Sequence, residues 1–188
     1  MPETEIRMAQ DGEILVRGPQ VTRGYFSEKE QPFMDGWLLT GDLGRQDAGY
    51  LIIEGRKKEL LATSYGKKIQ PQKIETMLRS IAGVTEAMVV AEDRPFCTAV
   101  LWTGEGAQLE TLDAEVGKVN SCLSHPEQIK NWAALRNDLT IGSGELTANL
   151  KLRRREVEKR RSALISALYG EGAPPQEVLH MGGSGREK

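Results

Sequence analysis

The chain has 188 residues, enough for one domain or for one domain and part of a second. Its 25 Lys and Arg and 27 Asp and Glu leave a net charge of −2, which argues against nucleic-acid binding through overall charge. Hydrophobic residues make up 39% of the chain, and no run approaches the ~18 apolar residues of a membrane span. The acidic first residues, two cysteines and two histidines predict no secretory signal, disulfide framework or metal site, so we expect a cytoplasmic protein.

Short β-rich runs and frequent glycines characterise the first 55 or so residues. Strands are expected at 13–17, 21–26, 37–40 and 50–53. The last two are separated by the turn Asp47-Ala48-Gly49, which predicts a hairpin. This pattern of short strands and frequent glycines is typical of a small barrel or an array of hairpins.

The pattern of apolar residues changes after residue 70. Pro71 can begin a helix, because Ile74, Met77, Leu78 and Ile81 recur at helical spacing before Gly83. The following segments predict strands at 84–91 and 98–102, then helices at 108–123, 126–137 and 153–169. Beyond Gly170 the chain is rich in Gly, Pro and Ser, which predicts a disordered tail.

These patterns predict an α+β protein, with a short sheet flanked by helices after a β-rich piece. We expect a β-rich piece at 1–57, a compact α+β domain at 58–170 and a flexible tail at 171–188.

Two residues of the β-rich piece are candidates for binding a nucleotide. Asp42 follows Thr40-Gly41, where a strand end could present its carboxylate to the two hydroxyls of a ribose. The alternative is an Asx turn that closes a hairpin. Arg56 follows Gly55 and could donate to ribose or phosphate oxygens, or could be a solvated surface arginine.

Two later segments carry candidate cations. The loop at Gly66 is followed by Lys67 and Lys68, and a glycine there permits a ligand to approach the backbone closely. Lys151 follows a polar turn and suits phosphate or carboxylate oxygens. Taken alone, the first segment could be a plain turn and the second a solvated lysine.

The order and spacing of these segments, from about residue 12 to 169, resemble the C-terminal portion of the AMP-forming acyl-CoA synthetases, or adenylate-forming enzymes. The most specific part runs from Gly55-Arg56-x-x-Glu59 through Gly66-x-x-Ile69-x-Pro71 to Ile74-Glu75. The sequences of residues 59–67 and 146–154 are most similar to the long-chain fatty acid branch.

The resemblance implies a reaction in two steps, in which a carboxylic acid reacts with Mg-ATP and coenzyme A then displaces AMP. It implies that Asp42 and Arg56 bind the nucleotide and that Lys58 is the hinge about which a small C-terminal domain rotates. It further implies that Gly66, Lys67 and Lys68 form the loop that lines the pantetheine tunnel. Lys151 would be the catalytic lysine of adenylation, which offsets the repulsion between carboxylate and α-phosphate.

The family's phosphate loop and acid pocket are absent from this sequence. We therefore expect a fragment that is inactive alone, binds none of ATP, Mg²⁺ and coenzyme A by itself, and has the missing N-terminal domain as its partner. The sequence leaves other parents open, namely an aryl or short-chain CoA ligase or a carrier-protein-loading ligase. A non-catalytic docking module is the alternative outside the enzyme class.

Residues 151–161 contain seven basic and two acidic side chains, a net charge of +5 against −7 for the rest of the chain. Our hypothesis is that this stretch attracts coenzyme A phosphates or an anionic membrane surface. The alternative is a solvated helix face that docks on the other domain.

Overall fold

The computed structural model describes residues 3–22, 24 and 32–183, and the chain divides into two compact units, Met1–Leu60 and Leu61–Lys188. The two units divide after Leu60, whereas the sequence placed the boundary after residue 57. The expected boundary therefore falls within the 3-10 helix η1, Lys57–Glu59, and the observed division follows that helix. Of the strand expected at 21–26, residues 23, 25 and 26 lie outside the described residues, and residues 21, 22 and 24 are not in a strand.

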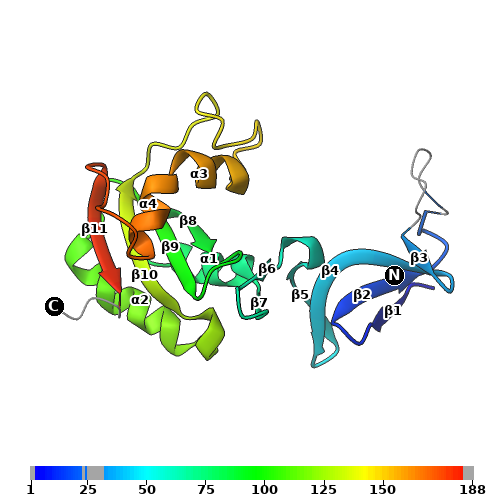
Figure 1. Cartoon of the computed structure of the whole chain (residues 1–188). Coiled ribbons are helices and arrows are strands. Elements are labelled where there is room, and N and C mark those ends of the chain that lie inside the picture. The colour runs from blue at the N-terminus through cyan, green and yellow to red at the C-terminus, as the bar shows by residue number, and fades with distance from the viewer. Residues whose placement is uncertain (1–2, 23, 25–31, 184–188) are drawn as a thin grey trace. The chain divides into compact units, whose positions relative to one another are not determined.

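The first unit is a five-stranded antiparallel sheet in which the long strand β4 pairs with three others, β2, β3 and β5 (Figure 1). Its strands are β1 Glu5–Met8, β2 Glu13–Arg17, β3 Phe33–Met34, β4 Trp37–Asp47 and β5 Tyr50–Arg56. The hairpin expected at Asp47 is confirmed, and its two central residues, Ala48 and Gly49, both have positive φ. Such a turn matches the twist of the flanking strands.

The second unit is an α+β sandwich around a four-stranded sheet, in the order β11-β10-β9-β8, with β9 and β10 parallel. The α+β class expected from the sequence is confirmed. Its strands are β6 Leu61–Ala62, β7 Lys68–Ile69, β8 Val84–Val90, β9 Cys97–Thr103, β10 Ile129–Arg136 and β11 Val178–Gly183. Its α-helices are α1 Pro71–Arg79, α2 Leu112–Ser121, α3 Arg154–Arg160 and α4 Ser162–Leu168. Two 3-10 turns, η2 Leu109–Thr111 and η3 His125–Glu127, precede α2 and β10.

Alternate residues of the strands point into two separate hydrophobic cores. Ala99 and Leu101 of β9 belong to the core that α1 and α2 cover. Val100 and Trp102 of the same strand belong to the core that α3 and α4 cover. The helices therefore lie on both faces of the sheet, with α1 and α2 on one and α3 and α4 on the other (Figure 1).

The helix expected at 126–137 is wrong, because this segment forms the inner strand β10. Its run Trp132 to Leu135 is buried throughout. A strand that is covered on both faces shows a continuous apolar run, and such a run resembles a helix segment in sequence. Pro126, read as an early helix residue, instead lies in η3.

The single helix expected at 153–169 is two helices, because the chain leaves helical geometry at Arg161, where φ is −99° and ψ is 23°. The Arg161 side chain is buried although the flanking residues 159, 160, 162 and 163 are exposed. The break thus coincides with a charged side chain that turns toward the interior.

The flexible tail expected at 171–188 is also wrong for its described part, because β11 pairs with β10. Gly182 lies opposite Trp132 in this pairing, and a Cβ at Gly182 would be 2.6 Å from the indole ring. The glycines of this segment therefore permit close packing on a neighbour, whereas their composition alone indicates flexibility.

We predict that Gly182→Ala destabilises the second unit by about 1–3 kcal/mol, because the new methyl group displaces the Trp132 ring. Gly117→Ala is the matched control, since Gly117 lies in α2 with open space around its Cβ. The same substitution there stabilises by up to about 1 kcal/mol through helix propensity. Urea unfolding of both variants measures the difference, and equal effects would contradict close packing at Gly182.

Candidate functional site

The sequence-predicted residues Asp42 and Arg56 lie directly opposite each other on β4 and β5. The Arg56 guanidinium donates toward the Asp42 carboxylate, with Nε 3.1 Å from Oδ1. Both side chains remain partly exposed, so each has hydrogen-bonding capacity left for a ligand. The structure thus brings together two residues that are fourteen positions apart in the sequence.

A bulge in β4 places Asp42 at this position. From Leu39 to Leu43 strand β4 advances four residues, while β2 advances only two, from Leu15 to Glu13. Gly41 has a φ of +73° within this bulge, a conformation that favours glycine. The Thr40 hydroxyl donates to the Ile14 carbonyl at 2.7 Å and accepts from the Asp42 amide at 3.1 Å.

Glu13 holds the bulge and the adjacent turn together, although no motif in the sequence marks it. Its carboxylate is buried, with Oε1 accepting from the Gly41 amide at 2.9 Å and Oε2 from Lys57 Nζ at 2.9 Å. Lys57 also pairs with Asp11 at 2.6 Å. Hydrogen bonds to Asp11 and then Glu13 raise the pKa of Lys57, and the Lys57 contact in turn lowers the pKa of Asp11.

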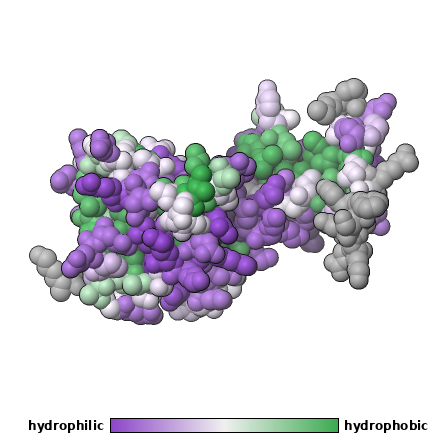
Figure 2. Space-filling view, turned by 90° about the horizontal axis from the view of Figure 1, so that it is seen from above, coloured by the Kyte–Doolittle hydropathy of each residue, from purple (hydrophilic) through white to green (hydrophobic). Residues whose placement is uncertain are grey.

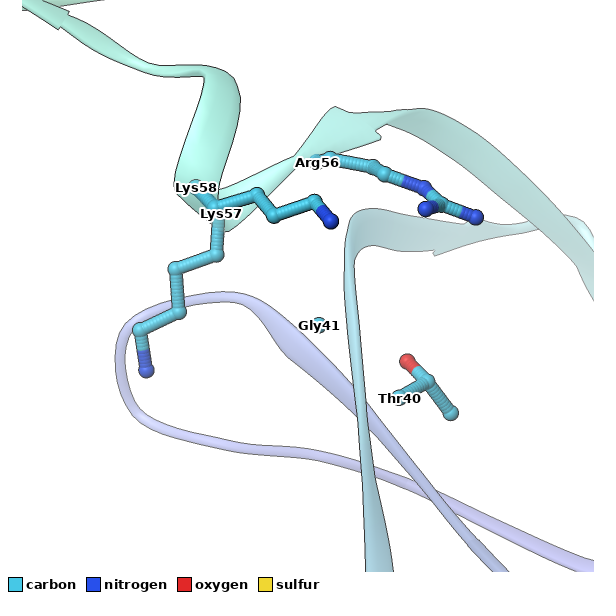
Figure 3. A pocket seen from close by; sticks show the side chains of 5 residues that line it. All are labelled: Thr40, Gly41, Arg56, Lys57 and Lys58. Carbon is cyan, nitrogen blue, oxygen red and sulfur yellow. The ribbon is translucent and has the colours of Figure 1, made fainter. Parts of the chain in front are cut away.

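An open hollow of about 320 Å³ lies in the first unit and is shown in Figure 3. It is lined by Thr40, Gly41, Arg56, Lys57 and Lys58. Arg56 and Lys57 are paired with carboxylates of the same unit, whereas Lys58 forms no ion pair with any residue that the structure describes. The hollow therefore combines a carboxylate neighbour with cations, which suits a sugar next to a phosphate.

The Gly66 loop is the connection between β6 and β7 in the second unit. Thr63 is buried and closes the loop, since its amide donates to the Lys67 carbonyl at 2.9 Å and its carbonyl accepts from the Gly66 amide at 2.8 Å. Gly66 has a φ of +71°, and nothing lies within 4 Å of where its Cβ would be. Lys67 and Lys68 are exposed beside it. The loop is thus fixed at its base and open at Gly66.

Lys151 is exposed at the end of a tight turn between β10 and α3. The Thr147 amide donates to the Lys151 carbonyl at 2.8 Å, and the Lys151 amide donates to the Thr147 hydroxyl at 3.0 Å. Leu146 and Leu152 form an isolated antiparallel bridge below this turn. The backbone at Lys151 is therefore held in place while its ammonium faces solvent.

The basic stretch 151–161 is not a uniform cationic face. Arg161 is buried among carboxylates, and Arg154 contacts Glu75 and the Val89 carbonyl. Arg160 lies 3.5 Å from Glu145. The exposed cations that remain are Lys151, Arg153, Arg155, Lys159 and Arg160. Charge reversal at Arg161 would consequently test folding of the unit and not an anion-binding surface.

Among the residues that the structure describes, no group of three or more His, Cys, Asp or Glu side chains is arranged to hold a metal ion. Within the same residues, no helix has both the length and the hydropathy that a bilayer crossing requires.

The second unit has the α+β architecture of the C-terminal domain of adenylate-forming enzymes. The family of AMP-binding enzyme C-terminal domains matches residues 58–173, and the chain belongs to this family.

Two curated relatives illustrate the similarity in sequence. The chain is 33% identical to the long-chain-fatty-acid–CoA ligase FadD15 of Mycobacterium tuberculosis, over 91% of this chain and 33% of the relative. It is 29% identical to the long-chain-fatty-acid–CoA ligase ACSBG1 of Mus musculus, over 85% of this chain and 29% of the relative. The chain thus spans about a third of the length of the curated relatives it matches.

A solved structure is similar in both fold and sequence. It is the o-succinylbenzoate CoA synthetase MenE of Bacillus subtilis in complex with the acyl-adenylate intermediate OSB-AMP. The TM-score is 0.67 at 28% identity, over 84% of this chain and 34% of that chain.

We predict that Glu13→Ala speeds solvent exchange of the Gly41 amide by about tenfold or more, because this half-buried amide loses its acceptor at a cost of about 1–3 kcal/mol. Hydrogen–deuterium exchange of the 188-residue chain measures this effect. Glu5→Gln is the control, since it breaks the exposed Arg17 pair in the same unit and leaves the bulge intact. Unchanged Gly41 exchange in Glu13→Ala would show that the carboxylate does not hold the bulge.

Proposed function

We propose that the chain is the C-terminal portion of a ligase that activates a long-chain fatty acid with ATP and transfers the acyl group to coenzyme A. The observation that carries the proposal is the Asp42–Arg56 pair beside a cation-lined hollow, in a chain whose second unit belongs to the AMP-binding family. The curated relatives FadD15 and ACSBG1 are both named as long-chain-fatty-acid–CoA ligases, which favours a fatty acid over an aryl or short-chain acid.

In this proposal the first unit holds part of the nucleotide. The Asp42 carboxylate accepts hydrogen bonds from the ribose hydroxyls of ATP, and Arg56 donates to ribose or phosphate oxygens. Lys58 forms no ion pair with a described residue. It is the hinge about which the C-terminal domain rotates between the two half-reactions. Its place in η1, just before the division between the units, supports that role.

Lys151 is the catalytic residue of adenylation in this scheme. An anionic carboxylate attacks an anionic α-phosphate, and a cation between them offsets the repulsion and stabilises the charge that develops in the transition state. A lysine on an anchored, exposed turn suits this task, because its flexible stem delivers a point charge that can later withdraw.

The Gly66 loop serves the second half-reaction. The open space over Gly66 admits the pantetheine arm of coenzyme A against the backbone, and Lys67 and Lys68 face its phosphates. A carrier-protein thiol is the alternative acceptor, and the two acceptors differ in whether free coenzyme A yields a thioester.

The partner in this proposal is an N-terminal domain that completes the site. Among the described residues, three buried hydrophobic residues lie in the first unit and thirty in the second. Ile6, Met34, Tyr50 and Ile53 of the first unit are exposed, and Figure 2 shows hydrophobic surface gathered there. A sheet with so small a core needs a further layer to stabilise it, which an N-terminal domain would supply. We place the protein in the cytoplasm, with membrane contact through the exposed cations of 151–160 as a further proposal.

We predict that Lys151→Ala lowers acyl-adenylate formation by about 10²- to 10³-fold, because the developing charge loses its cation. The assay uses a chimera in which this chain replaces the matching third of FadD15, and it measures ATP–pyrophosphate exchange with a fatty acid. Thioester formation from supplied acyl-adenylate is expected to change less than about threefold, because that step does not use the lysine in the proposed scheme.

Lys118→Ala is the matched control, because Lys118 is an exposed lysine on α2 of the same unit. Unimpaired adenylate formation in Lys151→Ala would overturn the role of Lys151. A folded wild-type chimera that forms no adenylate from any fatty acid would overturn the proposed function.

A further inference from the structure

The Arg161 side chain is a buried cation at the junction of α3 and α4. Only 5% of it is exposed, and it contacts three carboxylates from three different segments. Its Nε lies 3.1 Å from Glu145, and its two terminal nitrogens lie 2.7 Å from Asp138 and 2.9 Å from Glu177. Burial alone would lower the pKa of Arg161, but hydrogen bonds to Asp138 and Glu177 raise it overall, so the guanidinium stays charged.

Glu145 is the most deeply buried of the three carboxylates, with 1% of its side chain exposed. A buried carboxylate without its cation is costly, and breaking such a pair typically costs about 3–5 kcal/mol. Glu145 therefore stays next to Arg161, and the segment that carries Glu145 is fixed to the helix junction.

Glu145 also begins the turn that presents Lys151. Its carbonyl accepts from the Arg153 amide at 2.8 Å. Leu146, which follows Glu145, and Leu152, which precedes Arg153, form the antiparallel bridge. Thr147 then binds both backbone groups of Lys151. A continuous series of contacts thus runs from the Arg161 guanidinium to the backbone of Lys151.

This turn contains a residue in an unfavourable conformation. Leu150, which directly precedes Lys151, has a φ of +57° and is 66% exposed. The left-handed conformation costs roughly 1–2 kcal/mol for a residue with a Cβ, and an exposed leucine gains little from packing there. The turn therefore depends on contacts at its base, and the Arg161–Glu145 pair lies at that base.

We infer that Arg161 and Glu145 are positioning residues for Lys151, which hold the lysine turn at a fixed place on the second unit. The inference rests on the proposed role of Lys151 in adenylation. It predicts that weakening the pair loosens the Lys151 turn selectively and impairs adenylation without impairing thioester formation.

The first test uses Glu145→Gln in the 188-residue chain and measures hydrogen–deuterium exchange. The amides of Leu150 and Lys151 are expected to exchange tenfold or more faster, while those of Val100 and Leu101 in β9 keep their rates. Glu86→Gln is the matched control, because it removes the charge of a carboxylate paired with Arg79 at 2.8 Å elsewhere in the unit. Unchanged exchange at the turn, or equal acceleration throughout the unit, would overturn the inference.

Asp138→Asn provides a milder variant in case Glu145→Gln does not fold. The Asp138 side chain is 52% exposed, and the isosteric amide removes one negative charge beside Arg161 without leaving a cavity. We expect a twofold to fivefold acceleration confined to the same two amides. Absence of any selective acceleration in this variant would also contradict the inference.

The second test measures the two half-reactions in the FadD15 chimera. Glu145→Gln is expected to lower adenylate formation about tenfold or more and to leave thioester formation from supplied acyl-adenylate unchanged. Equal losses in both half-reactions would mean that the pair only stabilises the unit. If Lys151→Ala itself leaves adenylation intact, the proposed role of Lys151 fails, whereas the exchange result still decides whether the pair holds the turn.

Discussion

The buried Arg161 guanidinium is the constraint on which the arrangement of the C-terminal half of the second unit depends. A charge removed from water must be met by opposite charges, and here they come from the loop after β10, the base of the lysine turn and the segment before β11. The break between α3 and α4 lies at this same residue. One desolvated cation thereby connects three segments that are far apart in the sequence.

A second ion pair connects the two segments that carry the most specific sequence motifs of the family. Arg154, at the start of α3, contacts Glu75 of α1, and both also bind the backbone of Val89 in β8. Glu75 ends the stretch that begins with the Gly66 loop, and Arg154 follows the Lys151 turn. The proposed coenzyme A loop and the proposed adenylation lysine are therefore parts of one connected framework within the second unit.

The first unit organises its charges in a similar way but with a much smaller core. Glu13 is buried and compensates Lys57, while Asp42 compensates Arg56. Of the three cations that line the hollow, Lys58 alone then has no ion-pair partner among the described residues. In this unit hydrogen bonds to a strand bulge do the positioning that apolar packing does elsewhere in the chain.

Local patterns predicted the elements whose signals are local. The turn at Ala48-Gly49 predicts its hairpin because two positive φ values are needed there, and Pro71 with its apolar spacing predicts α1. The hairpin also places Asp42 opposite Arg56. The inner strand β10 could not be recognised in this way, because a continuous apolar run has no period that separates a buried strand from a helix. The strand β11 was not predicted, because its segment is rich in glycine and such a composition is typical of disorder.

The sequence by itself determined the family, the α+β class and the candidate residues Asp42, Arg56, Gly66 and Lys151, because these depend on residue type and spacing along the chain. Only the tertiary structure decided which charges are free and which are buried. Arg161 and Arg160 are neighbours with the same side chain, yet one is buried among three carboxylates and the other is largely exposed. The roles of Glu13, Glu145 and Arg161 follow from contacts across 16 to 44 positions of sequence, and such contacts have no local signal.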